Sequence, residues 1–121
     1  MSYPLKILLV EDEVVVGMLM RIELTRLGNE VVKHLTSGED AISFAQTNKL
    51  DLILMDIQLT GKTNGIDAAI AIRSESPVPI IFMTGYADSA IRERAETLEP
   101  LGYLLKPITG AQIQAIIEAR F

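Results

Sequence analysis

Cysteine is absent from the 121-residue chain, and so are long apolar runs and any surplus of positive charge. Without cysteine, neither disulfides nor a thiolate metal site can hold the fold together, which favours a reducing, cytoplasmic setting. No apolar run reaches the ~20 residues that a membrane span needs, and the first residues turn acidic too early for a secretory leader. We therefore expect a soluble, unprocessed protein without membrane contact.

The charge balance argues against one class of partner. Sixteen acidic residues against eleven basic ones give a net charge of -5, which is the wrong sign for neutralising the phosphates of a nucleic acid. Direct nucleic-acid binding by this domain is therefore not expected. The length and the 49% of hydrophobic residues suffice for one domain with a core of its own, which we expect to span residues 1–121.

Apolar segments alternate with helical patterns along the chain. In the first helical pattern, Val16, Met20, Leu24 and Leu27 share one face, and Gly28 supplies a left-handed stop. Short apolar runs and helical periodicity predict strands at 4–10, 30–34, 50–55, 78–83 and 102–105, and further helices at about 38–47, 65–74, 88–98 and 109–120. Five strand–helix pairs with short connections predict an α/β fold, a doubly wound parallel sheet covered by helices on both faces.

Polar side chains follow the predicted strands, at the edge where open α/β sheets bind ligands. They are Glu11, Asp12 and Glu13 after the first strand, Asp56 after the third, Thr84 after the fourth, and Lys106 with Pro107 after the fifth. Singly, each residue has a structural explanation, such as a helix cap or a turn. Together, several carboxylates at one edge repel one another unless a cation lies between them.

The available ligands indicate which cation this is. The chain offers oxygen ligands, no cysteine and a single histidine, His34, which we expect on the solvent-facing side of the second strand. Such a ligand set favours Mg²⁺, with Mn²⁺ as a second possibility. A lysine beside carboxylates and a metal is also what a transferring phosphoryl group requires for its oxygens, which makes Asp56 the natural nucleophile.

Over essentially the whole chain, these residues resemble the receiver domain of two-component response regulators. In that family an acidic pair follows strand one, a phosphorylated Asp ends strand three, Thr or Ser ends strand four, and Lys-Pro ends strand five. The resemblance implies a flavodoxin-like sheet of order 2-1-3-4-5 with five helices. It also implies that Asp56 accepts a phosphoryl group from a histidine kinase or a histidine phosphotransfer protein, in a self-catalysed step and not as a turnover enzyme.

The resemblance further assigns roles to individual residues. It implies that Asp12 and Asp56 bind Mg²⁺ directly, that Glu11 acts through water, and that the backbone carbonyl of Gln58 completes the protein ligands. Lys106 would pair with the phosphoryl group. Thr84 would turn toward the new phosphoryl oxygens.

A switch toward the output is implied as well. Tyr103 resembles the family's aromatic switch residue, with ordinary packing as the alternative, and the readout face would be helix four, strand five and helix five. Gln58 and Tyr86 flank the site and are expected to set the lifetime of the acyl phosphate. The loop after Asp56 departs from the common pattern, because Thr60 stands where proline is usual and the loop is one residue longer before Gly65. This loop resembles that of a subgroup of receivers.

The first predicted helix carries a second apolar stripe. Val15, Met18 and Ile22 lie opposite the stripe that should face the sheet, and both faces cannot be buried there. Since the resemblance implies that this helix docks the phosphodonor protein, we expect the outer stripe to contact a histidine kinase or phosphotransfer partner. Scattered surface apolar residues are the alternative.

Three rival functions can be weighed. A haloacid-dehalogenase-like phosphatase needs an acid two residues after its nucleophile, where this chain has Gln58, which cannot exchange protons at a useful pKa. A flavodoxin-like cofactor binder needs a phosphate loop after strand one, where Glu11 and Asp12 would repel the phosphate. An unphosphorylated receiver-like interaction or dimerisation module remains open, although no acidic, Thr or Lys site residue is missing.

Overall fold

The computed structural model describes residues 4–121 as five strands that alternate with five helices. The strands are β1 (Lys6–Val10), β2 (Glu30–Leu35), β3 (Leu52–Asp56), β4 (Ile80–Thr84) and β5 (Gly102–Leu105). The helices are α1 (Val14–Arg26), α2 (Gly38–Thr47), α3 (Gly65–Arg73), α4 (Ser89–Glu96) and α5 (Gly110–Arg120). None of these described helices is both long and apolar enough to cross a membrane.

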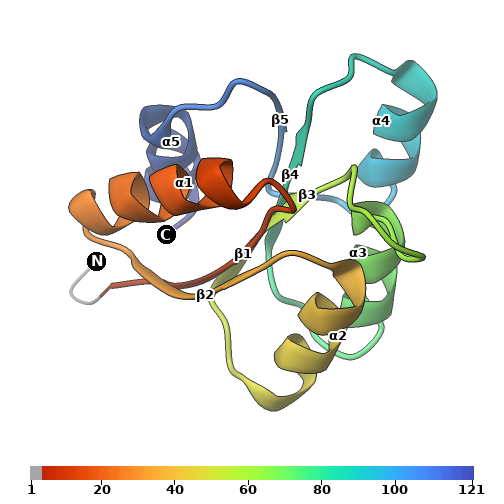
Figure 1. The fold of residues 1–121 in the computed structure, drawn as a ribbon, viewed down its shortest axis with the longest axis horizontal. Coiled ribbons are helices and arrows are strands. Elements are labelled where there is room, and N and C mark those ends of the chain that lie inside the picture. Colours follow the sequence, from red (N-terminus) through yellow and green to blue (C-terminus); the bar gives the residue numbers. More distant parts are fainter. Residues whose placement is uncertain (1–3) are drawn as a thin grey trace.

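The five strands form one parallel sheet in the order β2-β1-β3-β4-β5 (Figure 1). This order and the α/β class confirm the fold that the alternating pattern and the family resemblance predict. The ladders between central strands are in simple register, with Leu54 of β3 opposite Leu9 of β1 and Ile81 of β4. As a result β1, β3 and β4 end together, side by side, at one edge of the sheet.

Alternation of side chains along the central strands builds two cores. In β3, Ile53 and Met55 face the core formed with α2, α3 and α4, whereas Leu52 and Leu54 face the core formed with α1 and α5. All four side chains are fully buried. Figure 1 shows the same layers, with α1 and α5 together on one side of the sheet. Continuous apolar runs in the sequence therefore reflect burial on both faces.

Element ends differ from the sequence prediction by one or two residues, for local reasons. The ladder of β1 begins at Lys6, because Pro4 has no N–H to donate and Leu5 only accepts, from the N–H of Glu30. Asp88 lies just outside α4 and caps it by accepting the N–H of Ile91. After α1, Gly28 adopts a φ of 99°, the left-handed conformation that the sequence predicts there.

His34 was expected to face solvent, and its side chain is only partly exposed. The imidazole packs against the backbone of α1 at Gly17, and its Nε2 lies 2.9 Å from the backbone carbonyl of Glu11. Because a carbonyl only accepts hydrogen bonds, Nε2 carries the hydrogen in this contact. A Cβ at position 17 would overlap the ring, so glycine is required where α1 crosses the edge strand.

Replacing Gly17 with alanine should therefore destabilise the protein. Alanine favours a helix over glycine by about 1 kcal/mol, but overlap with the imidazole should outweigh this gain and give a net loss of roughly 1–3 kcal/mol. Urea unfolding of Gly17→Ala measures the change. In a His34→Ala background the same substitution should stabilise, since the ring is gone; stabilisation in both backgrounds would contradict the packing described here.

Candidate functional site

The polar residues predicted at the strand ends do meet at the carboxyl edge of the sheet. Glu11 and Asp12 follow β1 directly, Asp56 is the last residue of β3, and Thr84 is the last residue of β4. Lys106 follows β5, and its peptide bond to Pro107 is cis. The parallel sheet itself creates this gathering, because every strand delivers its carboxyl end to the same edge.

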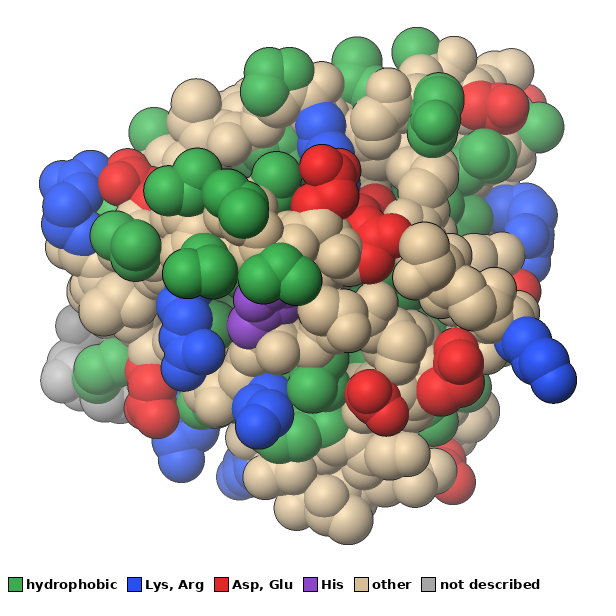
Figure 2. Space-filling model, viewed as in Figure 1, with side chains coloured by type: hydrophobic (Ala, Val, Ile, Leu, Met, Phe, Trp, Pro, Cys, Tyr) green, Lys and Arg blue, Asp and Glu red, His purple; other side chains and the backbone are tan. Residues whose placement is uncertain are grey.

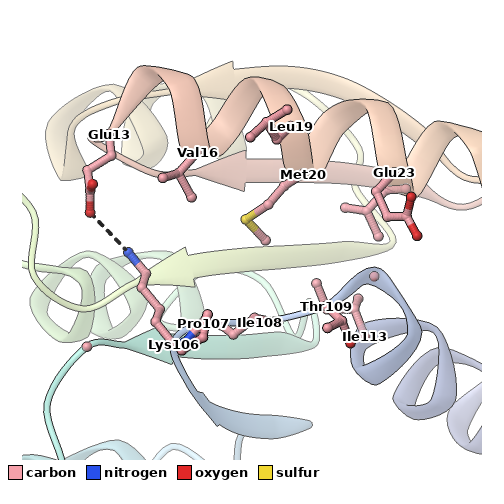
Figure 3. Close-up of a pocket in the computed structure, with 13 residues that line it drawn as sticks. Glu13, Val16, Leu19, Met20, Glu23, Lys106, Pro107, Ile108, Thr109 and Ile113 are labelled. Carbon is pink, nitrogen blue, oxygen red and sulfur yellow. Dashed lines mark ion pairs between the residues drawn. The ribbon is translucent and has the colours of Figure 1, made fainter.

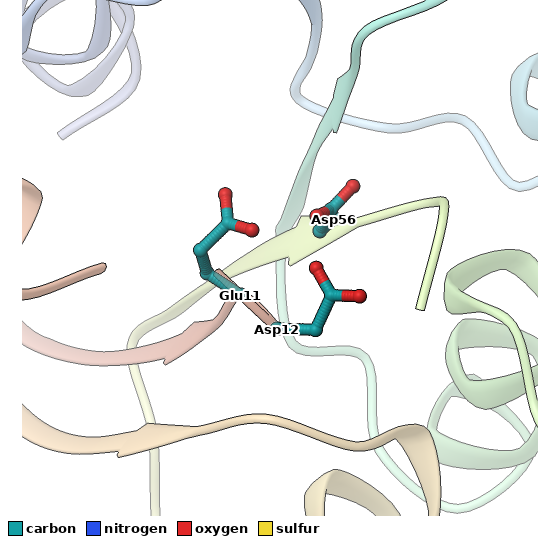
Figure 4. Close-up of side chains that lie close together, drawn as sticks. All are labelled: Glu11, Asp12 and Asp56. Atoms are coloured by element: carbon teal, nitrogen blue, oxygen red, sulfur yellow. The ribbon is translucent and has the colours of Figure 1, made fainter. Parts of the chain in front are cut away.

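Three carboxylates lie close together at this edge (Figure 4). Glu11, Asp12 and Asp56 each offer an oxygen, and these oxygens all lie within 4.8 Å of one another. The side chain of Glu11 is fully buried, that of Asp56 nearly so, and Asp12 is half-buried. Like charges at this separation and burial are costly without a counter-charge. The oxygen-only donor set suits a hard divalent cation such as Mg²⁺.

Lys106 supplies a counter-charge from the protein. Its Nζ lies 2.7 Å from Glu11 Oε1 and 2.9 Å from Asp56 Oδ2, and 3.9 Å from the exposed Glu13. The ammonium thus joins the ends of β1 and β3 through their carboxylates. Because the lysine side chain is only 19% exposed, solvent screens these contacts much less than it would on an open surface.

The carboxylates respond differently to their surroundings. Burial and, next, the Glu11 carboxylate outweigh the opposing effect of Lys106, so the pKa of Asp56 rises from 3.8 to about 7. Burial also acts to raise the pKa of Glu11, but its interactions with Asp56, Lys106 and the backbone N–H of Glu13 prevail and lower it. Burial acts to lower the pKa of Lys106, yet the two carboxylates raise it. Without a divalent cation, Asp56 is therefore the carboxyl most ready to hold a proton.

Gln58 and Thr84 complete the floor of the site. The backbone N–H of Gln58 donates to Asp56 Oδ1 (3.1 Å), and the side-chain carbonyl of Gln58 accepts the hydroxyl of Thr84 (2.8 Å). The backbone N–H of Tyr86 donates to the same hydroxyl oxygen (3.1 Å), while the Tyr86 side chain is exposed. Thr84 is fully buried, so its hydroxyl depends on these protein partners.

Tyr103 lies on β5, away from this group of contacts. Its half-buried ring packs against the core that includes α4, and the guanidinium of Arg92 lies 5.0 Å from the ring centroid. Within residues 4–121, no partner accepts or donates to its buried hydroxyl. Burial, the largest influence, raises the pKa of Tyr103. Ring and guanidinium form a cation–π pair between β5 and α4.

Most of the predicted site residues come together, and some contacts were missed. The structure places the acidic residues, Lys106, Gln58 and Thr84 around one point, whereas Tyr103 and the outer stripe of α1 lie apart from it. Sequence reasoning missed the bond from the Gln58 side chain to Thr84 and the support of the Glu11 backbone by His34. A glycine in the middle of α1, at Gly17, was the available signal for the second contact.

Comparison with known proteins now decides the family. The profile of the response regulator receiver domain matches residues 7–118. The chain belongs to the response regulator receiver family. Among curated relatives, it is 32% identical over 117 residues to the transcriptional regulatory protein PdtaR of Mycobacterium tuberculosis, covering 97% of this chain and 57% of that protein. An uncharacterized transcriptional regulatory protein of Bacillus subtilis, YrkP, is 35% identical, covering 95% and 48%.

Solved receiver domains have the same fold. One is the receiver domain of the sensor histidine kinase PA1611 from Pseudomonas aeruginosa, described with a magnesium ion coordinated in its active site cleft. It is 33% identical, with a TM-score of 0.85 and coverage of 96% of both chains. The receiver domain of a modulated diguanylate cyclase from Desulfovibrio desulfuricans is also 33% identical, with a TM-score of 0.89 and coverage of 96% and 92%. This receiver domain spans about half the length of the curated relatives it matches.

The raised pKa of Asp56 predicts a pH-dependent stability. A folded-state pKa of about 7 against 3.8 in the unfolded chain means that the folded receiver holds an extra proton between these pH values. Its stability therefore falls as the pH rises through that window. Between about pH 5 and about pH 8, the metal-free wild type should lose about 2 kcal/mol relative to Asp56→Asn.

Urea unfolding in the presence of a chelator measures this loss. Added Mg²⁺ should narrow the gap, because a cation that binds only the folded carboxylates stabilises the wild type. Replacing the exposed Glu118 of α5 by Gln is the matched control for the removal of one surface carboxylate. A gap between wild type and Asp56→Asn that stays constant or shrinks with rising pH would contradict the assignment.

Proposed function

We propose that this receiver domain, over residues 1–121, accepts a phosphoryl group on Asp56 in a Mg²⁺-dependent step and acts as a cytoplasmic signalling switch. One observation carries the proposal: a buried carboxylate at the end of the central strand contacts a lysine ammonium and lies beside two further carboxylates. The chain belongs to a two-component signalling family, which supports the proposed phosphoacceptor role. The donor would be a histidine kinase or a histidine phosphotransfer protein.

The chemistry follows from the positions of the side chains. One Asp56 carboxylate oxygen attacks the phosphorus of a phosphohistidine; the new P–O bond forms as the P–N bond breaks, and the imidazole leaves with its electron pair. Lys106, now 2.9 Å from Asp56 Oδ2, can follow the negative charge onto the phosphoryl oxygens. The hydroxyl of Thr84 can donate to the same oxygens after it turns away from Gln58.

Glu11, Asp12 and Asp56 would hold Mg²⁺, with the backbone carbonyl of Gln58 as a further ligand. Once bound, the cation would neutralise the clustered negative charge and favour the ionised form of Asp56. Hydrolysis by water would later return the carboxylate, so the domain would catalyse its own transfer and reset without being a turnover enzyme.

The signal would leave through α4, β5 and α5. Turning of Thr84 at the end of β4 alters the contacts of the segment that carries Tyr86, and Tyr86 and Tyr103 line one small cavity with Arg92. A local gain of charge at Asp56 would thus favour a second arrangement of Tyr103 and its neighbours. A partner domain or protein that binds this face would produce the output. We propose that the receiver domain itself does not contact nucleic acid.

The acceptor is tested by intact mass after brief incubation with acetyl phosphate. With Mg²⁺, the wild type should gain the mass of one phosphoryl group, and chelation should abolish the gain because the carboxylates then repel the donor. Asp56→Asn should gain nothing, while the control Asp51→Asn, at the start of the same segment, should behave as wild type. No gain, together with no binding of beryllofluoride, would favour an unphosphorylated interaction module instead.

Beside the site, this receiver domain has an apolar surface on which the donor protein would dock. Figure 2 shows hydrophobic side chains gathered over α1, next to acidic side chains. The predicted stripe of Val15, Met18 and Ile22 is 68%, 55% and 64% exposed, and Val14 and Leu19 extend it. A contiguous apolar patch of this kind on a helix is typical of a protein interface. Because α1 begins directly after the acidic pair, a partner on this helix would hold its phosphohistidine close to Asp56.

A cleft continues this surface toward α5 (Figure 3). It has a volume of about 760 Å³, and Val16 and Met20 of α1 face Ile108 and Ile113 across it. Lys106 lies at one end, where Glu13 points toward it. An apolar side chain of the docked donor helix would fit between the two helices, so we include the cleft in the proposed docking surface.

Charge placed on α1 should separate docking from chemistry. The double substitution of Val15→Lys and Met18→Lys should lower phosphotransfer from the cognate kinase at least about tenfold, because a desolvated ammonium opposes burial of the patch. Phosphorylation by acetyl phosphate should be unchanged. Ile70→Lys, on an exposed apolar residue of α3, is the matched control. Unaltered transfer from the kinase with an intact fold would show that the donor docks elsewhere.

A further inference from the structure

The Thr84 hydroxyl already has its single proton engaged in a hydrogen bond. Its oxygen accepts the backbone N–H of Tyr86 at 3.1 Å, and its single proton points to Gln58 Oε1 at 2.8 Å. The other acceptor in reach, the backbone carbonyl of Tyr86, is at 3.4 Å, a poor second choice. A hydroxyl has one proton to donate. Thr84 therefore cannot donate to a phosphoryl group on Asp56 while it donates to Gln58.

The neighbours of the Gln58 amide favour one of its two orientations. The backbone N–H of Gly85 lies 3.4 Å from Gln58 Oε1, and a donor at that place favours the oxygen, not the nitrogen, facing β4. The backbone N–H of Gln58 donates to Asp56 Oδ1, which holds the residue against the acceptor carboxylate. The Nε2 group is buried, and no partner for it exists within residues 4–121. The amide oxygen therefore accepts a hydrogen bond from Thr84, whereas the amide nitrogen donates none within residues 4–121.

We infer that the side chain of Gln58 is a positioning residue that competes with the phosphoryl group for the Thr84 hydroxyl. It holds Thr84 in the unphosphorylated arrangement and so weakens the phosphorylated one. The inference rests on the proposed phosphorylation of Asp56. Gln58 would act on that phosphoryl group indirectly, through the hydroxyl of Thr84 on the neighbouring strand, and not by direct contact.

The size of the effect follows from the two bonds that exchange. Phosphorylation replaces a bond to a neutral amide by a stronger bond to a charged oxygen, so the competition lowers the population of the switched form without preventing it. Removing the amide oxygen should leave the buried hydroxyl without its acceptor in the unphosphorylated form, so that this form loses the stabilising bond. A typical net hydrogen bond corresponds to about a fivefold change in an equilibrium constant.

Beryllofluoride, a phosphoryl mimic, tests this at equilibrium in the presence of Mg²⁺. Four proteins are compared by ¹⁹F NMR titration: wild type, Gln58→Leu, Thr84→Val and the double variant. Gln58→Leu should bind beryllofluoride about fivefold more tightly than wild type. In the Thr84→Val background, Gln58→Leu should leave the affinity unchanged, because the hydroxyl that transmits the effect is gone. Thr84→Ala serves if Thr84→Val fails to fold, as monitored by thermal unfolding.

The outcomes separate this inference from the proposal beneath it. Binding by the wild type with equal affinity for Gln58→Leu overturns the competition alone. An equal gain in both Thr84 backgrounds also overturns it, because Gln58 would then act on the phosphoryl site directly. A wild type that binds no beryllofluoride overturns the phosphoacceptor function and the inference together. Only a gain that depends on the Thr84 hydroxyl supports the competition.

Discussion

Repulsion among carboxylates at the edge of the sheet is the constraint around which the site is organised. A parallel sheet brings the ends of β1 and β3 together, and the sequence places acidic residues at both. Lys106 compensates part of this charge by contacting Glu11 and Asp56. Burial first, and the Glu11 carboxylate second, still raise the pKa of Asp56 despite the contact with Lys106. Repulsion between the carboxylates favours any event that lowers their negative charge. Such events are the binding of a cation and the uptake of a proton.

The second layer of the proposed site connects Asp56 to the segment after β4. Gln58 touches Asp56 through its backbone and Thr84 through its side chain, and Thr84 in turn holds the backbone of Tyr86. Of these three bonds, the 2.8 Å bond between Gln58 and Thr84 connects the ends of two strands, and the other two link residues two positions apart. A change at Asp56 therefore reaches the segment after β4 through only two residues. Beyond this segment, the guanidinium of Arg92 on α4 lies over the ring of Tyr103 on β5.

The fold and the first layer of the site could be predicted from the sequence because their signals are local. Buried apolar runs define the strands, and the residues that follow them, such as Asp12 and Asp56, are at the binding edge of any parallel sheet. The family resemblance supplied the strand order. Element ends were less predictable, since capping by Asp88 and the missing N–H of Pro4 shift them by one or two residues.

Contacts between side chains on different strands could not be predicted in the same way. The sequence around His34 does not indicate whether the imidazole faces solvent or packs against α1. Its hydrogen-bond partner is the backbone carbonyl of Glu11, and a backbone group leaves no mark in the sequence. The bond between Gln58 and Thr84 depends on register between β3 and β4 and on one rotamer. Such details depend on packing, and a single sequence specifies packing only through the complete fold.

Helix α1 lies beside the carboxylates and also carries the surface that we propose for docking of the donor. It begins two residues after Asp12, its inner side is fixed by the sheet and the ring of His34, and its outer side carries Val15, Met18 and Ile22 in solvent. Substitutions on the outer side meet no packing constraint, whereas those at the strand ends alter the charge balance. If the donor docks on α1 as proposed, a duplicated gene would diverge in partner choice through this one helical surface while its chemistry stayed intact. Such divergence would keep parallel signalling routes separate within one cell.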